Sequence, residues 1–178
     1  DNPVPGMHRY MPNGGYFETR SAVARQMSTE TGIKFTPDEI LMTCGAGGGL
    51  NVVMRTLLDP GDEVIVFSPY FVEYLFYADN YGASCSIIAP DQRYLPDLDA
   101  LSDSINHKTR IVLYNSPNNP TGVVYPSDVL TQIATIIQHK EKEFGTEIYM
   151  VSDEPYRKII FDGTPYDHVF KYHPRSIV

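Results

Sequence analysis

Two short stretches of this chain carry the residue types best able to do chemistry. Residues 116–122 read Ser-Pro-Asn-Asn-Pro-Thr-Gly and follow an apolar run, residues 110–114, that predicts a buried strand. Residues 152–156 read Ser-Asp-Glu-Pro-Tyr and follow a second such run, residues 147–151. The first stretch offers amides that donate and accept hydrogen bonds, and the second offers a carboxylate and a phenol. Because ligands of open α/β sheets bind at the carboxyl ends of the strands, both stretches are candidates for ligand contact.

Each stretch also has a purely structural interpretation. Asparagine, proline and glycine are ordinary turn residues, so residues 116–122 could form no more than a strand-exit turn. Asp153 could serve only as the N-cap of a helix, a role that aspartate often takes before a proline. If the backbone does become helical there, Asp153 and Tyr156 lie three positions apart and share one face.

A glycine-rich stretch supplies a third chemical group. Residues 40–43 predict a short strand, residues 44–51 (Cys-Gly-Ala-Gly-Gly-Gly-Leu-Asn) predict a turn, and residues 52–58 have helical spacing. This combination is a natural anion site, because exposed amides and the helix dipole favour negative charge. The alternative is close packing of the helix against the strand. The stretch has neither the lysine of a P-loop nor the spacing of a dinucleotide fingerprint.

Aromatic side chains follow the strand predicted at residues 63–67. They lie in the run Ser-Pro-Tyr-Phe-Val-Glu-Tyr, residues 68–74. A ring just beyond a strand can cover the face of a planar ligand, although such residues more often pack in a helix core.

Strands and helices alternate along the whole chain. Helical patterns end near residues 31, 58, 81, 106 and 144, and further strands are predicted at residues 84–89 and from residue 177. The charged run at residues 140–143 is typical of the solvated face and end of the last helix. Right-handed crossovers then give a three-layer α/β fold, a mostly parallel sheet with helices on both faces.

Composition excludes several classes of protein. The 178 residues carry a net charge of −8 without a basic cluster, which argues against nucleic-acid binding. No apolar run reaches membrane-spanning length. The two cysteines, Cys44 and Cys85, form no disulfide framework and no metal-ligand pattern, and both are expected to be buried free thiols. A reducing cytoplasm fits this usage.

The groups at the four predicted strand ends can converge on one edge of the sheet. Together they suit a planar, phosphorylated heteroaromatic ring whose nitrogen must stay protonated. Amides at residues 45–47 would hold the phosphate, and Phe71 would cover a ring face. Asp153 would pair with the ring nitrogen, while Asn119 and Tyr156 would bond a phenolic oxygen. Pyridoxal 5′-phosphate is such a molecule, and an acid beside its nitrogen tunes it as an electron sink.

The chain resembles the class I and II aminotransferases, the fold-type-I family of pyridoxal-phosphate enzymes. The matching motifs occur in family order: Tyr-Met-Pro at 10–12, Cys-Gly-Ala at 44–46, Leu-Leu-Asp-Pro-Gly-Asp-Glu-Val at 57–64, Asn-Asn-Pro-Thr-Gly at 118–122 and Asp-Glu-Pro-Tyr at 153–156. The asparagine motif followed by the aspartate–tyrosine pair is the most specific part. The extra glycines at 47–49 and the proline at 155 depart from the usual family pattern but leave the cofactor roles intact.

The resemblance implies a set of cofactor-binding residues: Gly45, Ala46, Gly47, Phe71, Asn119, Asp153, Tyr156 and Tyr10. Phe71 stands at the family's usual stacking position, with Tyr70 as the alternative. Tyr10 stands where the family has a tyrosine that reaches the phosphate of the neighbouring subunit, which implies a homodimer with shared sites. The resemblance also suggests a cis peptide bond between Asn119 and Pro120.

The family also implies a domain organisation and an activity. Residues 1–36 would be the N-terminal loop and helix of the large domain, and residues 37–178 its cofactor-binding part, ending before the family's Schiff-base lysine and small domain. The activity would be transfer of an amino group from an amino acid to a 2-oxo acid. We expect no catalytic residue and no metal site within these residues, no turnover by them alone, and a surface position for Lys158.

Three alternatives remain open from the sequence. One is another pyridoxal-phosphate reaction, such as elimination or decarboxylation. A second is a non-catalytic aminotransferase-like domain of a transcription regulator. The third is a nucleotide-binding α/β protein that uses the glycine-rich stretch, although this leaves Asp153 and Tyr156 without a role.

Overall fold

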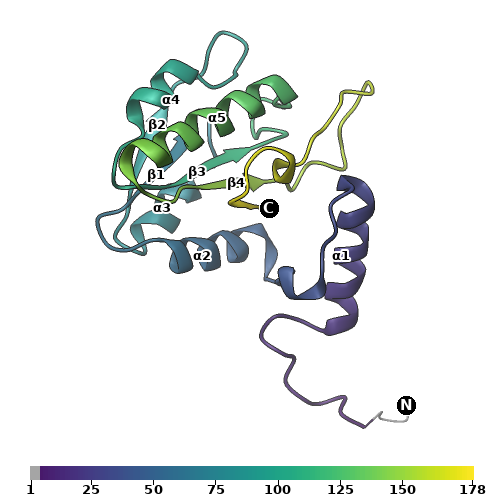
Figure 1. The fold of residues 1–178 in the computed structure, drawn as a ribbon. Helices are drawn as coiled ribbons and strands as arrows, with labels where there is room; N and C mark the ends of the chain where they lie inside the picture. Colours follow the sequence, from purple (N-terminus) through teal and green to yellow (C-terminus); the bar gives the residue numbers. More distant parts are fainter. Residues whose placement is uncertain (1–4) are drawn as a thin grey trace. The chain divides into compact units, whose positions relative to one another are not determined.

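The structure is a computed structural model that describes residues 5–178 (Figure 1). Two compact units can be distinguished, Asp1–Gly49 and Leu50–Val178. Helix α2 (Gly45–Leu57) begins in the first unit and ends in the second. The second unit contains the β-sheet and half of the candidate site residues, namely Phe71, Asn119, Asp153 and Tyr156.

The first unit is built around helix α1 (Phe17–Thr31) and the 3₁₀ helix η1 (Pro37–Glu39). Helix α1 ends where the sequence predicts, at Gly32, whose φ of 73° is the left-handed conformation of a glycine C-cap. Arg20 ties the two elements together, because its guanidinium donates a hydrogen bond to the Pro37 carbonyl at 2.5 Å.

Five parallel strands form the sheet of the second unit. They are β1 (Glu63–Phe67), β2 (Ser84–Ile88), β3 (Thr109–Asn115), β4 (Tyr149–Asp153) and β5 (Ser176–Ile177). Their spatial order is β2-β1-β3-β4-β5, and each neighbouring pair is parallel. The direction of winding reverses between β1 and β3, and such a switch point is where open α/β sheets bind their ligands.

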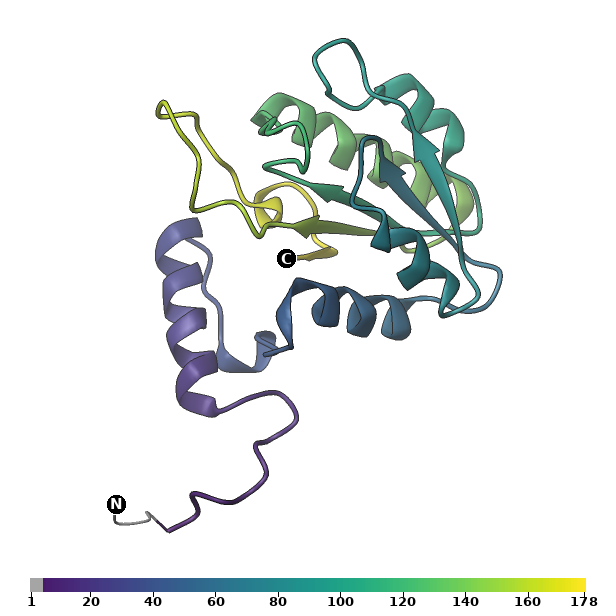
Figure 2. The ribbon, with the colours of Figure 1, turned by 180° about the vertical axis from the view of Figure 1, so that it is seen from behind.

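Helices cover both faces of the sheet, as the sequence predicts. Helices α2 and α3 (Glu73–Asp79) lie on one face, and helices α4 (Leu98–Ser104) and α5 (Ser127–Phe144) lie on the other (Figure 1). Figure 2 shows the same layers from behind. Because side chains alternate along a strand, Val66 of β1 packs in the cluster with α2 and α3, whereas Ile65 packs in the cluster with α4 and α5.

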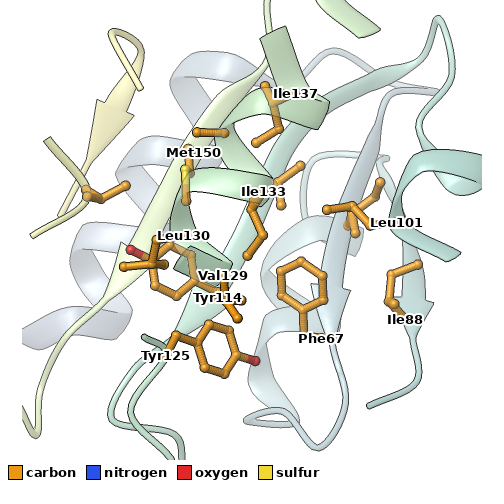
Figure 3. Close-up of a cluster of buried hydrophobic side chains, with 14 of the residues drawn as sticks. Phe67, Ile88, Leu101, Tyr114, Tyr125, Val129, Leu130, Ile133, Ile137 and Met150 are labelled. Atoms are coloured by element: carbon orange, nitrogen blue, oxygen red, sulfur yellow. The ribbon is translucent and has the colours of Figure 1, made fainter. Parts of the chain in front are cut away.

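The cluster beneath α4 and α5 is the larger part of the core (Figure 3). Ile133 and Ile137 of α5 are completely buried in it. Tyr114 of β3 stacks on Tyr125, with ring centroids 5.7 Å apart. This aromatic packing holds the carboxyl end of β3, after which the Asn-Pro-Thr-Gly loop begins.

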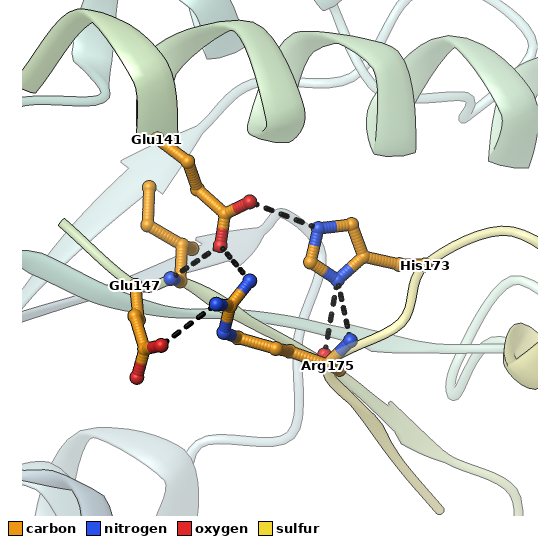
Figure 4. Close-up of polar contacts among 5 residues, drawn as sticks. Glu141, Glu147, His173 and Arg175 are labelled. Atoms are coloured by element: carbon orange, nitrogen blue, oxygen red, sulfur yellow. Dashed lines mark hydrogen bonds and ion pairs between the residues drawn. The ribbon is translucent and has the colours of Figure 1, made fainter. Parts of the chain in front are cut away.

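A polar network fastens the C-terminal segment to the end of α5 (Figure 4). The Glu141 carboxylate accepts the Ile148 N–H at 2.9 Å and lies 3.3 Å from the Arg175 guanidinium. Nε2 of the buried His173 lies 3.5 Å from the second Glu141 oxygen. Arg175 also pairs with Glu147 at 2.7 Å. The solvated face predicted for residues 140–143 is therefore wrong for Glu141, whose side chain is 12% exposed and serves three partners.

Replacing Glu141 with alanine is expected to lower the free energy of unfolding by about 2–4 kcal/mol. The change leaves the buried Ile148 N–H without its acceptor and removes the carboxylate beside His173 and Arg175, and buried groups that lose a partner are costly. Chemical denaturation measures the effect. The control is Glu143→Ala, because Glu143 is partly exposed and pairs with Lys140; it should change stability by less than about 1 kcal/mol. Equal losses in the two variants would contradict the role of the network.

Three predictions of secondary structure are wrong. Residues 40–43 pair with no strand; instead the Met42 N–H donates to the Gly14 carbonyl at 3.1 Å. The predicted glycine-rich turn is the first turn of α2, which starts at Gly45, because the apolar positions later in that helix are buried and fix it against the sheet. Strand β4 starts two residues later than predicted and includes Asp153, because its pairing with β3 continues to that residue.

Both cysteines are free, but only one is partly buried. Burial, followed by the charge on Glu63, raises the pKa of the Cys85 thiol to about 11. Cys44 is exposed, contrary to the prediction, because it precedes α2 and follows no strand. Within residues 5–178, none of the helices combines the length and the apolar character that a membrane span requires.

Candidate functional site

The candidate site is centred on Asp153, the last residue of β4. The phenol of Tyr74, on α3, donates a hydrogen bond to Oδ2 of Asp153 at 2.5 Å. Tyr74 is almost completely buried, and the ring of Phe71 meets it edge-on, with centroids 5.8 Å apart. The carboxylate is therefore held in one orientation by a side chain that is itself fixed by packing.

Burial dominates the electrostatics of this pair. Burial raises the pKa of Asp153, the Tyr74 hydrogen bond lowers it, and the charge on Glu154 raises it further. Burial and the nearby Asp153 charge raise the pKa of the Tyr74 phenol, which therefore stays protonated and can donate. A partly desolvated carboxylate with a neutral donor is well suited to a cationic ligand group, since such a group would favour the ionised acid.

The asparagine loop is joined to β4 through Asn115, the last residue of β3. Nδ2 of Asn115 donates to the Asp153 carbonyl at 2.8 Å, and its Oδ1 accepts the Asn119 N–H at 2.6 Å. Asn115 and Asp153 are also paired in the sheet register. These bonds bring two of the predicted site residues, Asn119 and Asp153, to the same edge of the sheet.

The neighbouring asparagine, Asn118, shapes the loop itself. Its Oδ1 accepts the Thr121 hydroxyl at 2.8 Å, and its Nδ2 donates to the Pro69 carbonyl at 3.1 Å. The cis peptide bond suggested between Asn119 and Pro120 is present. Asn118 is buried and Asn119 half-buried, so Asn119 is the asparagine that a ligand can reach.

Two aromatic side chains are exposed near this edge. Phe71 is 37% exposed and Tyr156 is 36% exposed, so a ligand can contact both rings. No helix starts at Asp153, because the chain continues in turns, in which the Ile159 N–H donates to the Tyr156 carbonyl at 2.9 Å. The interpretation of Asp153 as a helix N-cap is therefore wrong.

A hollow of about 530 Å³ adjoins the asparagine loop. Asn119 and its loop neighbours line one part of it, and residues 156–164, including Tyr156 and Phe161, line the rest. In Figures 1 and 2 this second segment extends outward after β4. The volume lies in the range of small-molecule sites.

The remaining predicted site residues belong to the first unit. Gly45, Ala46 and Gly47 form the first turn of α2, and Gly45 has a φ of 74°. The predicted glycine-rich turn is helical, but a helix N-terminus also favours negative charge, so these residues can still bind an anion. Tyr10 is fully exposed. The approach of these residues to Asp153 stays a prediction.

The acid next to Asp153 has a different environment. The Glu154 side chain is 3% exposed and lies 3.4 Å from Nδ1 of His168 and 3.8 Å from the Arg157 guanidinium. Glu154 is buried and Asp153 is only partly buried, so Asp153 is the acid that a ligand can reach.

Sequence reasoning missed Tyr74 and Asn115. One signal was available for Tyr74, which stands three residues after Phe71 at the start of a helix, a spacing that lets side chains meet. For Asn115 the signal was weaker, a polar residue that ends an apolar strand. Neither signal identifies Asp153 as the partner.

A family model described as aminotransferase class I and II matches residues 4–175. The chain belongs to this family. A probable aspartate/prephenate aminotransferase of Thermus aquaticus is 38% identical over 162 residues, which cover 89% of this chain and 40% of that relative. This family uses pyridoxal 5′-phosphate as its cofactor.

Solved aminotransferase structures have the same fold. A crystal structure of an amino transferase from Eubacterium rectale matches with a TM-score of 0.95 and 36% identity, over 99% of this chain and 45% of that one. An aspartate aminotransferase from Thermus thermophilus with maleate matches with a TM-score of 0.85 and 33% identity, over 94% and 43% respectively. The chain thus spans less than half the length of these relatives, and the predicted family and fold class are confirmed.

Proposed function

We propose that this chain forms the cofactor-binding part of an aminotransferase that moves an amino group from an amino acid to a 2-oxo acid. The observation that carries the proposal is the partly desolvated Asp153 carboxylate, held by Tyr74 and joined to the Asn119 loop through Asn115. Family membership supports the same reaction class. The names of the Thermus relatives make aspartate the first amino acid to test.

The residues present fit the cofactor, because an acid, an amide, a phenol and an aromatic ring are all at least partly exposed. They belong to Asp153, Asn119, Tyr156 and Phe71. When bound, pyridoxal phosphate supplies an electron sink. Asp153 would hold a proton on the ring nitrogen. Asn119 and Tyr156 would donate to the phenolic oxygen, and Phe71 would cover a ring face. The first turn of α2, residues 45–47, would hold the phosphate.

The proposed enzyme is a homodimer of the cytoplasm. A homodimer would bring Tyr10 of one subunit to the phosphate of the other, and the full exposure of Tyr10 leaves it available for this contact. The two free cysteines, one of them exposed, suit the reducing cytoplasm. Residues 1–36 and 37–178 would serve as the N-terminal segment and the cofactor-binding part of one large domain.

Calorimetric titration with pyridoxamine 5′-phosphate tests the proposal on this chain. The amine form of the cofactor has no aldehyde and cannot form an imine with surface lysines, so any saturable binding reports the site. We expect one site per chain and an affinity roughly tenfold lower in Asn119→Ala, which loses one hydrogen bond to the ligand. Binding of ADP with no binding of pyridoxamine phosphate would instead support a nucleotide-binding protein.

A further inference from the structure

The side chain of Asn115 forms hydrogen bonds to two of the candidate ligand-binding residues. It is 4% exposed, and both polar atoms of its side chain are used. One atom bonds the backbone of Asp153 at 2.8 Å and the other bonds the backbone of Asn119 at 2.6 Å. The Asn115 side chain thus connects the backbone of Asp153 to the backbone of Asn119.

A carboxamide can make both bonds from two separate atoms of one short side chain. The Asp153 carbonyl requires a donor and the Asn119 N–H requires an acceptor, and a carboxamide carries one of each on a rigid plane. Aspartate has the same shape but only acceptors when ionised, and alanine has neither group. The planar carboxamide therefore fixes the spacing of the two backbone positions together with the strand pairing of Asn115 and Asp153.

This spacing matters if both residues contact one rigid ring. A pyridine nitrogen and a phenolic oxygen on the same ring are a fixed distance apart, so their protein partners must be too. We propose that Asn115 is a positioning residue of the cofactor site, which sets the separation between the Asp153 carboxylate and the Asn119 amide without touching the cofactor. This inference rests on the function proposed above.

The chain offers a matched control at the opposite end of the same strand. Asn106 precedes β3, donates from Nδ2 to Glu63 at 2.9 Å and accepts the Lys108 N–H at Oδ1 at 2.9 Å. It thus bridges two segments with the same two atoms, but at the amino end of the sheet. Nδ2 of Asn106 also donates to the Ser104 carbonyl at 3.1 Å, so Asn106→Ala removes at least as many bonds as Asn115→Ala. Only Asn115 lies beside the candidate ligand-binding residues.

The experiment compares Asn115→Ala, Asn115→Asp and Asn106→Ala with the unmodified chain by titration with pyridoxamine 5′-phosphate. We expect both Asn115 variants to bind roughly tenfold to a hundredfold more weakly, since a misplaced Asn119 or Asp153 loses a charge-assisted bond. Asn106→Ala should bind as the unmodified chain does. Circular dichroism melts confirm that each variant is folded at the titration temperature.

A second readout separates positioning from general loosening. The absorbance of the bound ligand reports ionisation of its phenolic oxygen. A misplaced Asn119 no longer stabilises the phenolate, so the pH of this transition should rise in Asn115→Ala and stay unchanged in Asn106→Ala. If Asn115→Ala and Asn115→Asp match the unmodified chain in affinity and in this transition, the positioning role is wrong while the proposed function stands. If the unmodified chain binds no ligand, the proposed function itself fails.

Discussion

Replacing Asp153 with asparagine should weaken binding of pyridoxamine 5′-phosphate by about a hundredfold or more while leaving the protein equally or more stable. The affinity falls because a neutral amide cannot stabilise a protonated ring nitrogen, and loss of one member of a partly buried charge pair is among the largest single effects in binding. Calorimetry at neutral pH measures the affinity, and thermal denaturation measures the stability.

The stability part of this prediction follows from the raised pKa of Asp153. A carboxyl group whose pKa is higher in the folded protein contributes stability below its unfolded pKa, and that contribution is lost as the pH rises through the folded pKa. At neutral pH the ionised, desolvated acid therefore opposes folding, and its neutral isostere removes this opposition. A melting temperature well below that of the unmodified chain would show that Asp153 has a structural role instead of a ligand-binding one.

Tyr74→Phe should shift the pH dependence of ligand binding. The variant keeps the buried ring but loses the hydroxyl that donates to Oδ2 of Asp153, so the pKa of Asp153 rises further. Because binding requires the ionised carboxylate, affinity is lost on acidification, and this loss should begin about one pH unit higher in the variant. Titrations across the acidic range measure the shift, and affinity well above both transitions should be nearly equal.

Helix α3 supplies a matched control for this experiment. Tyr77 lies one turn after Tyr74 and also donates its phenolic hydrogen to a carboxylate, that of Glu73. The other charged group that acts on Asp153 is Glu154, which is retained in both Tyr74→Phe and Tyr77→Phe. Tyr77→Phe should leave the acidic transition in place. An equal shift in both variants would attribute the effect to α3 as a whole.

The hydrophobic pattern predicts much of the second unit because that pattern is local. Apolar runs bounded by turn signals identify β1, β2 and β3 to within about one residue, and Gly145 ends α5 as predicted. The pattern fails at residues 40–43, which resemble a strand but have no neighbouring strand to pair with. It also fails at the start of α2, where the glycines predict a turn. These glycines are helical because the later part of the same helix is buried and stabilises the whole element.

The amino-acid sequence alone predicts most of the element order, the fold class and the candidate ligand-binding side chains, because the hydrophobic patterns and the family-like motifs are each local along the chain. The contacts that hold those side chains depend on the fold. Tyr74 lies 79 positions from Asp153, and Asn115 reaches it from the adjacent strand, 38 positions away. Such partners are chosen by strand pairing and helix packing, which no local pattern encodes. The same holds for Glu141, which stands in a charged run but has a largely buried carboxylate with partners outside the helix.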